Sequence, residues 1–354
     1  MGRLWRFLLT LGLCACNSAP FGGTPQAVSY DQFSTPSQSF SIQNLGTVPG
    51  AAKSWANAVN DAGVVAGLAG DGNQNNVAVK FINGSAVELS PPNTYGGSIA
   101  VSINSFGDTV GGVAESDGVH AIMWPATGGK VDLQAGSGWS LSSATSINDA
   151  RQIVGTGAYG NNLTLPFEYA NGRMSQLPIP SGETIGEAFA INKEGVTVGL
   201  SEGSSLHATL YHPKSVRILG PPDKYSIAIS INNQGHVTGL ISPLKGGYAF
   251  FFDGKTFQRI ARPAKTNSCA GLAINNSDDI TVDCRPGGSF IYRSGRYIDV
   301  SSLLPANSGW TDLSASAMSD NCRIVGTGLT RENGRLVRRA FEMVPPGGTC
   351  PAGL

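Results

Sequence analysis

A phrase of the form apolar-Asn-x-x-Gly-x-Val-Val-Gly recurs seven times along this chain of 354 residues. Its Asn position is filled by Asn60, Asn104, Asn148, Asn192, Asn232 and Asn275, and by Ser319 in the last copy. Successive copies lie 44, 44, 44, 40, 43 and 44 residues apart. A fixed period of this length indicates that one supersecondary unit is repeated along the chain.

Each repeat contains four short strand-like stretches. The first ends at the Asn, and the second follows it after a turn, as in 144–148 and 152–155. The third pairs a small residue with a larger one three places on: Ala78 with Phe81, Ala121 with Trp124, Pro166 with Tyr169, Ala208 with Tyr211, Ala249 with Phe252, Ser289 with Tyr292 and Ala340 with Met343. The fourth ends at Leu89, Leu133, Leu177, Leu219, Ile260 and Val300. Four antiparallel strands at this period are typical of a propeller blade, with a β-solenoid as the alternative.

The two ends of the repeat array distinguish these folds. The last copy lacks its fourth stretch, while a spare stretch precedes the first copy and ends at Leu45, 44 residues before Leu89. One strand from the start and three from the end would complete a closed ring, which removes exposed sheet edges. We therefore predict an all-β, seven-bladed β-propeller over residues 39–345, with four antiparallel strands per blade and the N-terminal strand joining the last blade.

Turn chemistry explains the phrase itself. An Asn side chain can accept bonds from nearby backbone N–H groups, and a Gly supplies the positive φ at which a hairpin resumes. The predicted turn residues are Asn60, Gly63, Asn104, Gly107, Asn148, Asn192, Gly195, Asn232, Gly235 and Asn275. The second Gly of the phrase, as in Gly155, indicates a bulge or a close approach of two backbones.

The N-terminus predicts export. Arg3 and Arg6 precede a short apolar run, and Leu13-Cys14-Ala15-Cys16 resembles the lipobox of bacterial lipoproteins. That resemblance implies a signal peptide over residues 1–15 and lipidation of Cys16. Cys14 fits the role badly because bulky Leu13 precedes it. The alternative is an ordinary secretory signal.

Residues 16–38 are rich in Pro, Gly, Ser, Thr and Gln and are expected to form a flexible tether. Asn17 stands where an Asp would retain a Gram-negative lipoprotein in the inner membrane, so the resemblance favours the outer membrane. The expected location is the cell envelope, as an outer-membrane lipoprotein facing the periplasm or the surface. The membrane would then be one partner, through the lipid.

Four more cysteines, Cys269, Cys284, Cys322 and Cys350, suggest two disulfides in an exported chain. Cys269 and Cys284 flank one hairpin. If Ile274 faces Ile280, Cys269 lies one place out of register with Cys284, and a bulge would bring them opposite each other. Cys322 and Cys350 pair by elimination, which ties the tail 346–354 to the seventh blade, with Cys322 near the ring surface. Metal binding is the rival, without any Cys-x-x-Cys pair to support it.

Several phrases resemble the HAF-repeat family of extracellular and surface proteins. His120-Ala121, His207-Ala208, and the Ile-Asn pairs that begin at Ile103, Ile147, Ile191, Ile231 and Ile274 carry the likeness, together with Lys130-Val131-Asp132-Leu133. No copy reads His-Ala-Phe. The resemblance implies a repeat β-fold outside the cytoplasm and no settled activity.

No catalytic motif stands out. The 24 acidic and 24 basic residues balance, so a nucleic-acid partner is not expected. The four histidines, His120, His207, His212 and His236, show no metal-ligand spacing, and no metal or cofactor is expected. A Gly-x-Ser-x-Gly elbow is absent, and the acids fall mostly in turns.

Trp55, Trp139 and Trp310 are the candidate ligand contacts, because each lies near the start of a first strand. Exposed there, they could stack on sugars or hold peptide side chains, whereas buried they would pack the blades. The favoured function is a non-catalytic, lipid-anchored binding or scaffolding protein for a protein or glycan ligand, acting as a monomer. The alternative is a carbohydrate-active hydrolase or lyase with acidic residues at the channel mouth.

Overall fold

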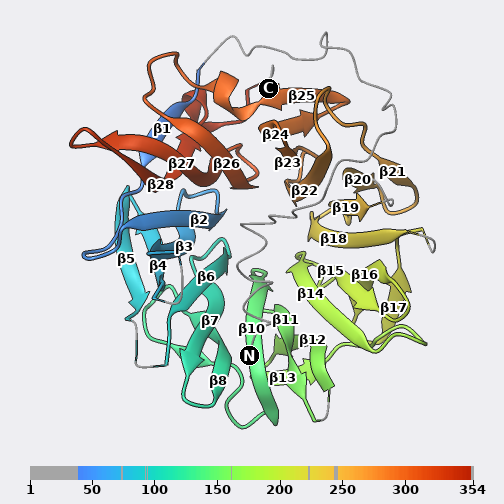
Figure 1. Cartoon of the computed structure of the whole chain (residues 1–354). Coiled ribbons are helices and arrows are strands. Elements are labelled where there is room, and N and C mark those ends of the chain that lie inside the picture. The colour runs from blue at the N-terminus through green and yellow to red at the C-terminus, as the bar shows by residue number, and fades with distance from the viewer. Residues whose placement is uncertain are drawn as a thin grey trace.

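Seven four-stranded antiparallel sheets surround a central axis in the computed structural model (Figure 1). The structure describes residues 39–72, 75–91, 93, 95–160, 162–221, 224–242 and 246–351. Within these ranges there is no α-helix, and two 3-10 turns occur at Val300–Leu303 and Pro346–Gly348. The predicted seven-bladed propeller is confirmed. The signal peptide, Cys16 and the tether, residues 1–38, lie outside the described residues.

Each blade runs from an innermost strand beside the axis to an outer strand, and the blades are numbered 1 to 7 along the chain. The innermost strands are β2 (Lys53–Val59), β6 (Ser98–Ile103), β10 (Trp139–Ile147), β14 (Ile185–Ile191), β18 (Tyr225–Ile231), β22 (Ser268–Ile274) and β26 (Thr311–Met318). The second strands are β3 (Val65–Gly70), β7 (Thr109–Glu115), β11 (Ile153–Tyr159), β15 (Thr197–Glu202), β19 (Val237–Ser242), β23 (Ile280–Arg285) and β27 (Ile324–Glu332). The third strands are β4 (Val77–Ile82), β8 (Gly118–Trp124), β12 (Asn162–Ala170), β16 (Leu206–His212), β20 (Tyr248–Phe252), β24 (Gly288–Arg293) and β28 (Arg335–Val344). The outer strands are β5 (Ser85–Ser90), β9 (Val131–Asp132), β13 (Arg173–Gln176), β17 (Ser215–Ile218), β21 (Phe257–Arg259), β25 (Arg296–Asp299) and β1 (Ser41–Asn44).

The ring closes through β1, as the ends of the repeat array predict. β1 is the outer strand of blade 7 and pairs antiparallel with β28, from Ser41 opposite Val344 to Asn44 opposite Phe341 (Figure 1). Phe40 and Leu45 flank β1 and are 0% and 1% exposed. The first strand of the fold is therefore held by residues about 300 positions away in sequence.

A bulge interrupts the pairing of the two innermost strands in every blade. In blade 3 the register shifts between Ala144 and Ser146, beside Gly155. A Cβ on Gly155 would lie 2.1 Å from the carbonyl oxygen of Ser143, closer than any real contact. The second Gly of the phrase is thus required by close backbone approach, as expected. Blade 6 differs, because its glycine, Gly271, lies on the innermost strand, opposite Val282 on the second strand.

The hydrophobic core lies between neighbouring blades. One cluster, for example, joins Ala66 and Ala78 of blade 1 to Ile103 and Trp124 of blade 2. The small residue of each third strand lets the next sheet approach, and Ala78, Ala121, Ala208, Ala249 and Ala340 are all 0% exposed. The sheets therefore stack face to face around the axis.

Serines on innermost strands cross these contacts. Ser98 Oγ accepts a hydrogen bond from the N–H of Ala78 at 2.8 Å, and Ser142, Ser226 and Ser54 serve Ala121, Ala208 and Ala340 in the same way at 3.1, 3.0 and 2.9 Å. Where the third strand carries Pro166, which has no N–H, Gly186 replaces the serine. A Cβ on Gly186 would lie 2.9 Å from Cδ of that proline. The N–H donor on the third strand and the serine acceptor on the next innermost strand are therefore missing at the same contact.

Both disulfides join the cysteines that the sequence pairs. The bulge between Gly271 and Ala273 sets Cys269 opposite Cys284, with a sulfur–sulfur distance of 2.03 Å. Cys322 bonds Cys350. Cys322 lies in the turn after β26, within reach of the tail as expected, although its side chain is 0% exposed once it is bonded to Cys350. The two disulfides indicate an oxidising compartment outside the cytoplasm. A search of the described residues finds no helix with the length and apolar character needed to cross a membrane.

Candidate functional site

The mouth of the central channel is formed where the innermost strands turn into the second strands. A cavity of about 290 Å³ lies there, and each blade contributes three consecutive residues to its lining. An apolar ring comes from Val59, Ile103, Ile147, Ile191, Ile231, Ile274 and Met318. The Asn positions form the next ring, and Asp61, Ser105, Asp149, Lys193, Asn233, Asn276 and Asp320 form the rim.

The Asn side chains do more than the turn chemistry predicts. As expected, Asn192 Oδ1 accepts hydrogen bonds from the N–H groups of Glu194 and Val196 at 3.1 and 3.0 Å. Its Nδ2, however, donates to the carbonyl oxygen of Asn232 in the next blade at 3.1 Å. The same bond runs from blade to blade, with Asn60, Asn104, Asn148, Asn232 and Asn275 as the other donors. We call this set the Asn clasp. Only a side chain with both an acceptor and a donor can fill both roles.

Blade 7 closes the clasp differently. Ser319 stands at the Asn position and offers no amide to blade 1. Instead Asn321, two residues further on, donates through Nδ2 to the carbonyl oxygen of Asp61 at 2.9 Å, and its backbone N–H donates to Asp61 Oδ1 at 3.2 Å. The seam between the last and first blades is thus bridged at the mouth as well as at β1.

Replacing Asn192 with Asp should test the clasp. The carboxylate keeps an acceptor for the turn but loses the donor to Asn232, so the free energy of unfolding should fall by about 1–2 kcal/mol, the usual cost of leaving a buried carbonyl unpaired. Urea denaturation measures it. Asn333→Asp, at the exposed tip of the β27–β28 hairpin, is the matched control and should change little. Equal effects of both substitutions would contradict an interblade role.

The left-handed position of each turn shows a second kind of interblade contact. Gly63, Gly107, Gly195 and Gly235 have φ between 78° and 87°, as predicted, but Arg151, Asp278 and Cys322 adopt φ of 57°, 63° and 64° at the same place. Each of these three side chains reaches back to the preceding blade: Arg151 to Asp108, Asp278 to His236, and Cys322 to Arg293. The contact offsets the backbone strain that a Gly would avoid.

Asp108 is the buried end of the first of these contacts. It is 0% exposed and bonds Arg151 Nε at 2.8 Å and Asn104 Nδ2 at 3.1 Å. Burial raises the pKa of this carboxyl, but the bonds to Arg151, the backbone of Ala126 and Asn104 outweigh it and hold the pKa below its usual range. The resulting stabilisation is present at neutral pH and is lost as pH falls through the lowered pKa.

The rim carboxylates serve as acceptors between blades. Asp149 Oδ1 accepts from the N–H of Ser105 at 2.9 Å, Asp320 accepts from the N–H of Asn276 at 2.7 Å, and Asp61 accepts from Asn321. No His or Tyr is among the described residues that line this cavity. Their hydrogen bonds give these acids a structural role in joining neighbouring blades.

The histidines lie apart from the mouth or in ion pairs. His120 is bracketed by Asp132 at 2.7 Å and Asp117 at 2.8 Å, while His207 contacts Glu183 at 3.0 Å. Burial lowers the pKa of His120, but the two carboxylates outweigh it and raise the pKa above the ordinary value. The interaction of protonated His120 with Asp132 and Asp117 therefore stabilises the fold at pH below about 6.5. It weakens as pH rises through the raised pKa of His120.

Among the residues that the structure describes, one group has metal-binding atoms within reach of one another. Asp279, Cys322 and Cys350 cluster, but the two sulfurs are bonded to each other and Asp279 is paired with Arg293. A disulfide sulfur is not a thiolate ligand. These residues therefore do not fit a metal ion while the disulfide is intact.

The three tryptophans prove to be packing residues for most of their surface. Trp139 is 6% exposed and meets Phe167 edge-on at 5.6 Å, and Trp310 is half-buried and meets Phe341 edge-on at 5.8 Å. Both lie over a glycine, since a Cβ on Gly157 or Gly328 would come within 2.8 or 3.1 Å of the indole. Trp55 is also half-buried and lies against Gly72.

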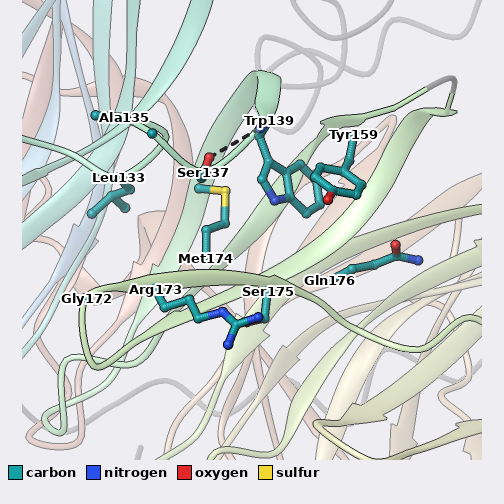
Figure 2. A pocket seen from close by; sticks show the side chains of 11 residues that line it. Leu133, Ala135, Ser137, Trp139, Tyr159, Gly172, Arg173, Met174, Ser175 and Gln176 are labelled. Carbon is teal, nitrogen blue, oxygen red and sulfur yellow. Dashed lines mark hydrogen bonds between the residues drawn. The ribbon is translucent and has the colours of Figure 1, made fainter.

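Trp139 nevertheless borders a second cavity, of about 520 Å³, which we call the blade 3 groove (Figure 2). One side is the loop from Leu133 to Ser137, which joins blade 2 to blade 3, and the other is β13 with Gly172 before it. Trp139 and Tyr159 face each other across the β10–β11 pair with ring centroids 5.4 Å apart. Tyr159 is 45% exposed. It was not predicted from the sequence, although its aromatic side chain ends the strand opposite Trp139.

The structure is similar to several solved structures at low sequence identity. The TolB of Acinetobacter baumannii superposes with a TM-score of 0.43 and 11% identity over 82% of this chain and 62% of that one. Puromycin hydrolase gives 0.54 and 13% over 86% and 53%. The β-propeller domain of the Trilobed protease from Pyrococcus furiosus gives 0.50 and 11% over 83% and 94%. The chain thus spans about half to three fifths of the first two structures. The second and third of these likenesses show the fold alone. The sequence matches no protein-family model and no curated protein.

Proposed function

We propose that this chain is a non-catalytic binding propeller, held at the bacterial cell envelope by a lipid on Cys16. The main support is the channel mouth. Its seven central positions are Asn or Ser. The Asn amides and the rim carboxylates form hydrogen bonds between neighbouring blades. A hydrolase or lyase would need two acids, or an acid and a base, facing a substrate at a fixed gap.

The envelope location rests on two independent features. The sequence from Leu13 to Cys16 resembles a lipobox, and both disulfides suit an oxidising compartment. Residue 39, where the described fold begins, lies next to β1 in blade 7, so a tether of residues 16–38 would enter the ring at its seam.

The function is tested by measuring binding and turnover with the same preparation. The full chain is screened against immobilised oligosaccharides and against envelope proteins, and the oligosaccharides that bind are then incubated with it and analysed for cleavage. A binding propeller should retain a ligand unchanged. Cleavage that Asp149→Asn or Asp61→Asn abolishes would instead establish the enzyme.

Replacing Cys16 with Ser should release the protein from membranes. Without the thiol no thioether-linked lipid forms, so labelling by a clickable fatty acid should vanish and the protein should move to the soluble fraction. Cys14→Ser is the matched control and should leave both unchanged. Labelling that persists in Cys16→Ser and disappears in Cys14→Ser would place the lipid on the other cysteine.

A further inference from the structure

We propose that the blade 3 groove is a saccharide-binding site, with the exposed ring of Tyr159 as its stacking platform. This inference rests on the proposed binding function and names its ligand class and location. The cavity of about 520 Å³ falls within the range of about 300–1,000 Å³ that small-molecule sites occupy. Figure 2 shows the rings of Trp139 and Tyr159 against each other on one side and β13 on the other.

The local structure is built around this aromatic pair. β10 has nine residues, against six to eight in the other innermost strands, and its first residue, Trp139, is paired with the last residue of β11, Tyr159. Gly157 leaves room for the indole, and a Cβ on Gly138 would come within 3.3 Å of the Tyr159 ring. Trp139 supports the tyrosine from behind, so the platform is rigid before any ligand arrives.

Blade 7 provides an internal comparison. Its Trp310 lies over Gly328 as Trp139 lies over Gly157. Thr330, however, stands at the position of Tyr159 and is 9% exposed. A tryptophan packed over a glycine therefore occurs in both blades, whereas the exposed tyrosine belongs to blade 3 and is not needed for that packing.

The exposure of the lining selects the ligand class. The apolar floor is already covered, because Leu133, Trp139 and Met174 are 2%, 6% and 7% exposed. A hydrophobic peptide side chain would gain little further burial there. A cationic side chain would meet no carboxylate among the described lining residues, of which Arg173 is the one that carries a charge.

What remains accessible is one aromatic ring, the exposed Arg173 and a polar rim of Ser137, Ser175 and Gln176. A sugar presents the matching chemistry, since its C–H face packs on a ring and its hydroxyls donate and accept at the edge. The edge position of β13 adds unpaired backbone groups to that rim.

The test uses the full chain on an array of defined neutral and uronate-bearing oligosaccharides, followed by titration of the best binder. Tyr159→Ala should lower its affinity about tenfold or more, while Tyr159→Phe, which keeps the ring, should retain most of it. Tyr225→Ala is the matched control, because Tyr225 is 50% exposed on blade 5 outside the groove, and it should bind like the parent. Thermal denaturation of each variant shows that the fold is intact.

Two results would overturn the proposal. Unchanged sugar affinity in Tyr159→Ala would place the sugar site elsewhere, and absence of binding to every oligosaccharide would exclude the ligand class. In either case a purified protein ligand held without turnover would leave the binding function standing. Cleavage of the array sugars would overturn the proposed function itself.

Discussion

Replacing Phe40 and Leu45 together with Ala should open the ring or leave it barely stable. Phe40 packs with Ile298, Phe341 and their neighbours, and Leu45 packs in a different cluster with Val65 and Val79. Phe→Ala and Leu→Ala changes at buried sites cost about 3–5 and 2–5 kcal/mol, and contributions from separate clusters add. The sum approaches the whole stability of a typical domain, about 5–15 kcal/mol.

Denaturant titration of the double variant and of each single variant measures this effect. Ser41→Ala is the control on the same strand, because Ser41 is exposed and should change the free energy of unfolding by less than about 0.5 kcal/mol. If the double variant unfolds like the parent, β1 is not what closes the ring. A loss confined to blade 7, seen by hydrogen exchange, would show instead that the blades unfold separately.

Replacing Glu187 with Gln should stabilise the fold at alkaline pH. Glu187 lies on β14 in the inner part of blade 4, where burial, and secondarily the charge of Glu202, raise the pKa of its carboxyl from 4.5 to about 7. The folded chain therefore binds this proton more tightly than the unfolded chain does. The destabilisation is absent below pH 4.5, grows between pH 4.5 and 7, and is complete above pH 7.

A pKa shift of this size corresponds to about 3 kcal/mol. The free energy of unfolding of Glu187→Gln should therefore exceed that of the parent by up to this amount at about pH 8, and should equal it near pH 4.5. Urea denaturation across this pH range measures the difference. Glu194→Gln removes the same charge from a side chain that is 67% exposed, and should show no such pH dependence. A gain from Glu187→Gln that is equal at all pH values would mean that shape, and not titration, is responsible.

The repeat and its two ends sufficed to predict the propeller and its closure. The period reported the number of blades, and the missing fourth stretch after Met343 together with the spare stretch at Leu45 reported which strands complete blade 7. This works because a strand edge left unpaired is costly, so the count of strands has one closed solution. The Cys269–Cys284 disulfide could also be predicted, because the register of two strands in one hairpin is set by residues close together in sequence.

The candidate site was much less predictable. Trp139 was singled out as a candidate ligand contact, but its burial against Phe167 and the exposure of Tyr159 beside it arise only in the folded blade. Glu187 carried no signal, because its neighbours along the chain do not bury it. Side chains that meet across strands and blades are distant in sequence and leave no fixed spacing to find.

The Asn of the repeat shows the same division within one side chain. That Asn148 ends a strand and shapes a turn could be predicted from the repeat, because its Oδ1 acts within four residues, on the N–H of Gln152. That its Nδ2 joins one blade to the next, at the carbonyl oxygen of Asn192, is visible only in the folded ring. The difference is one of range: a turn is satisfied by the residues beside it, whereas an interblade bond exists only after the sheets have stacked around a common axis.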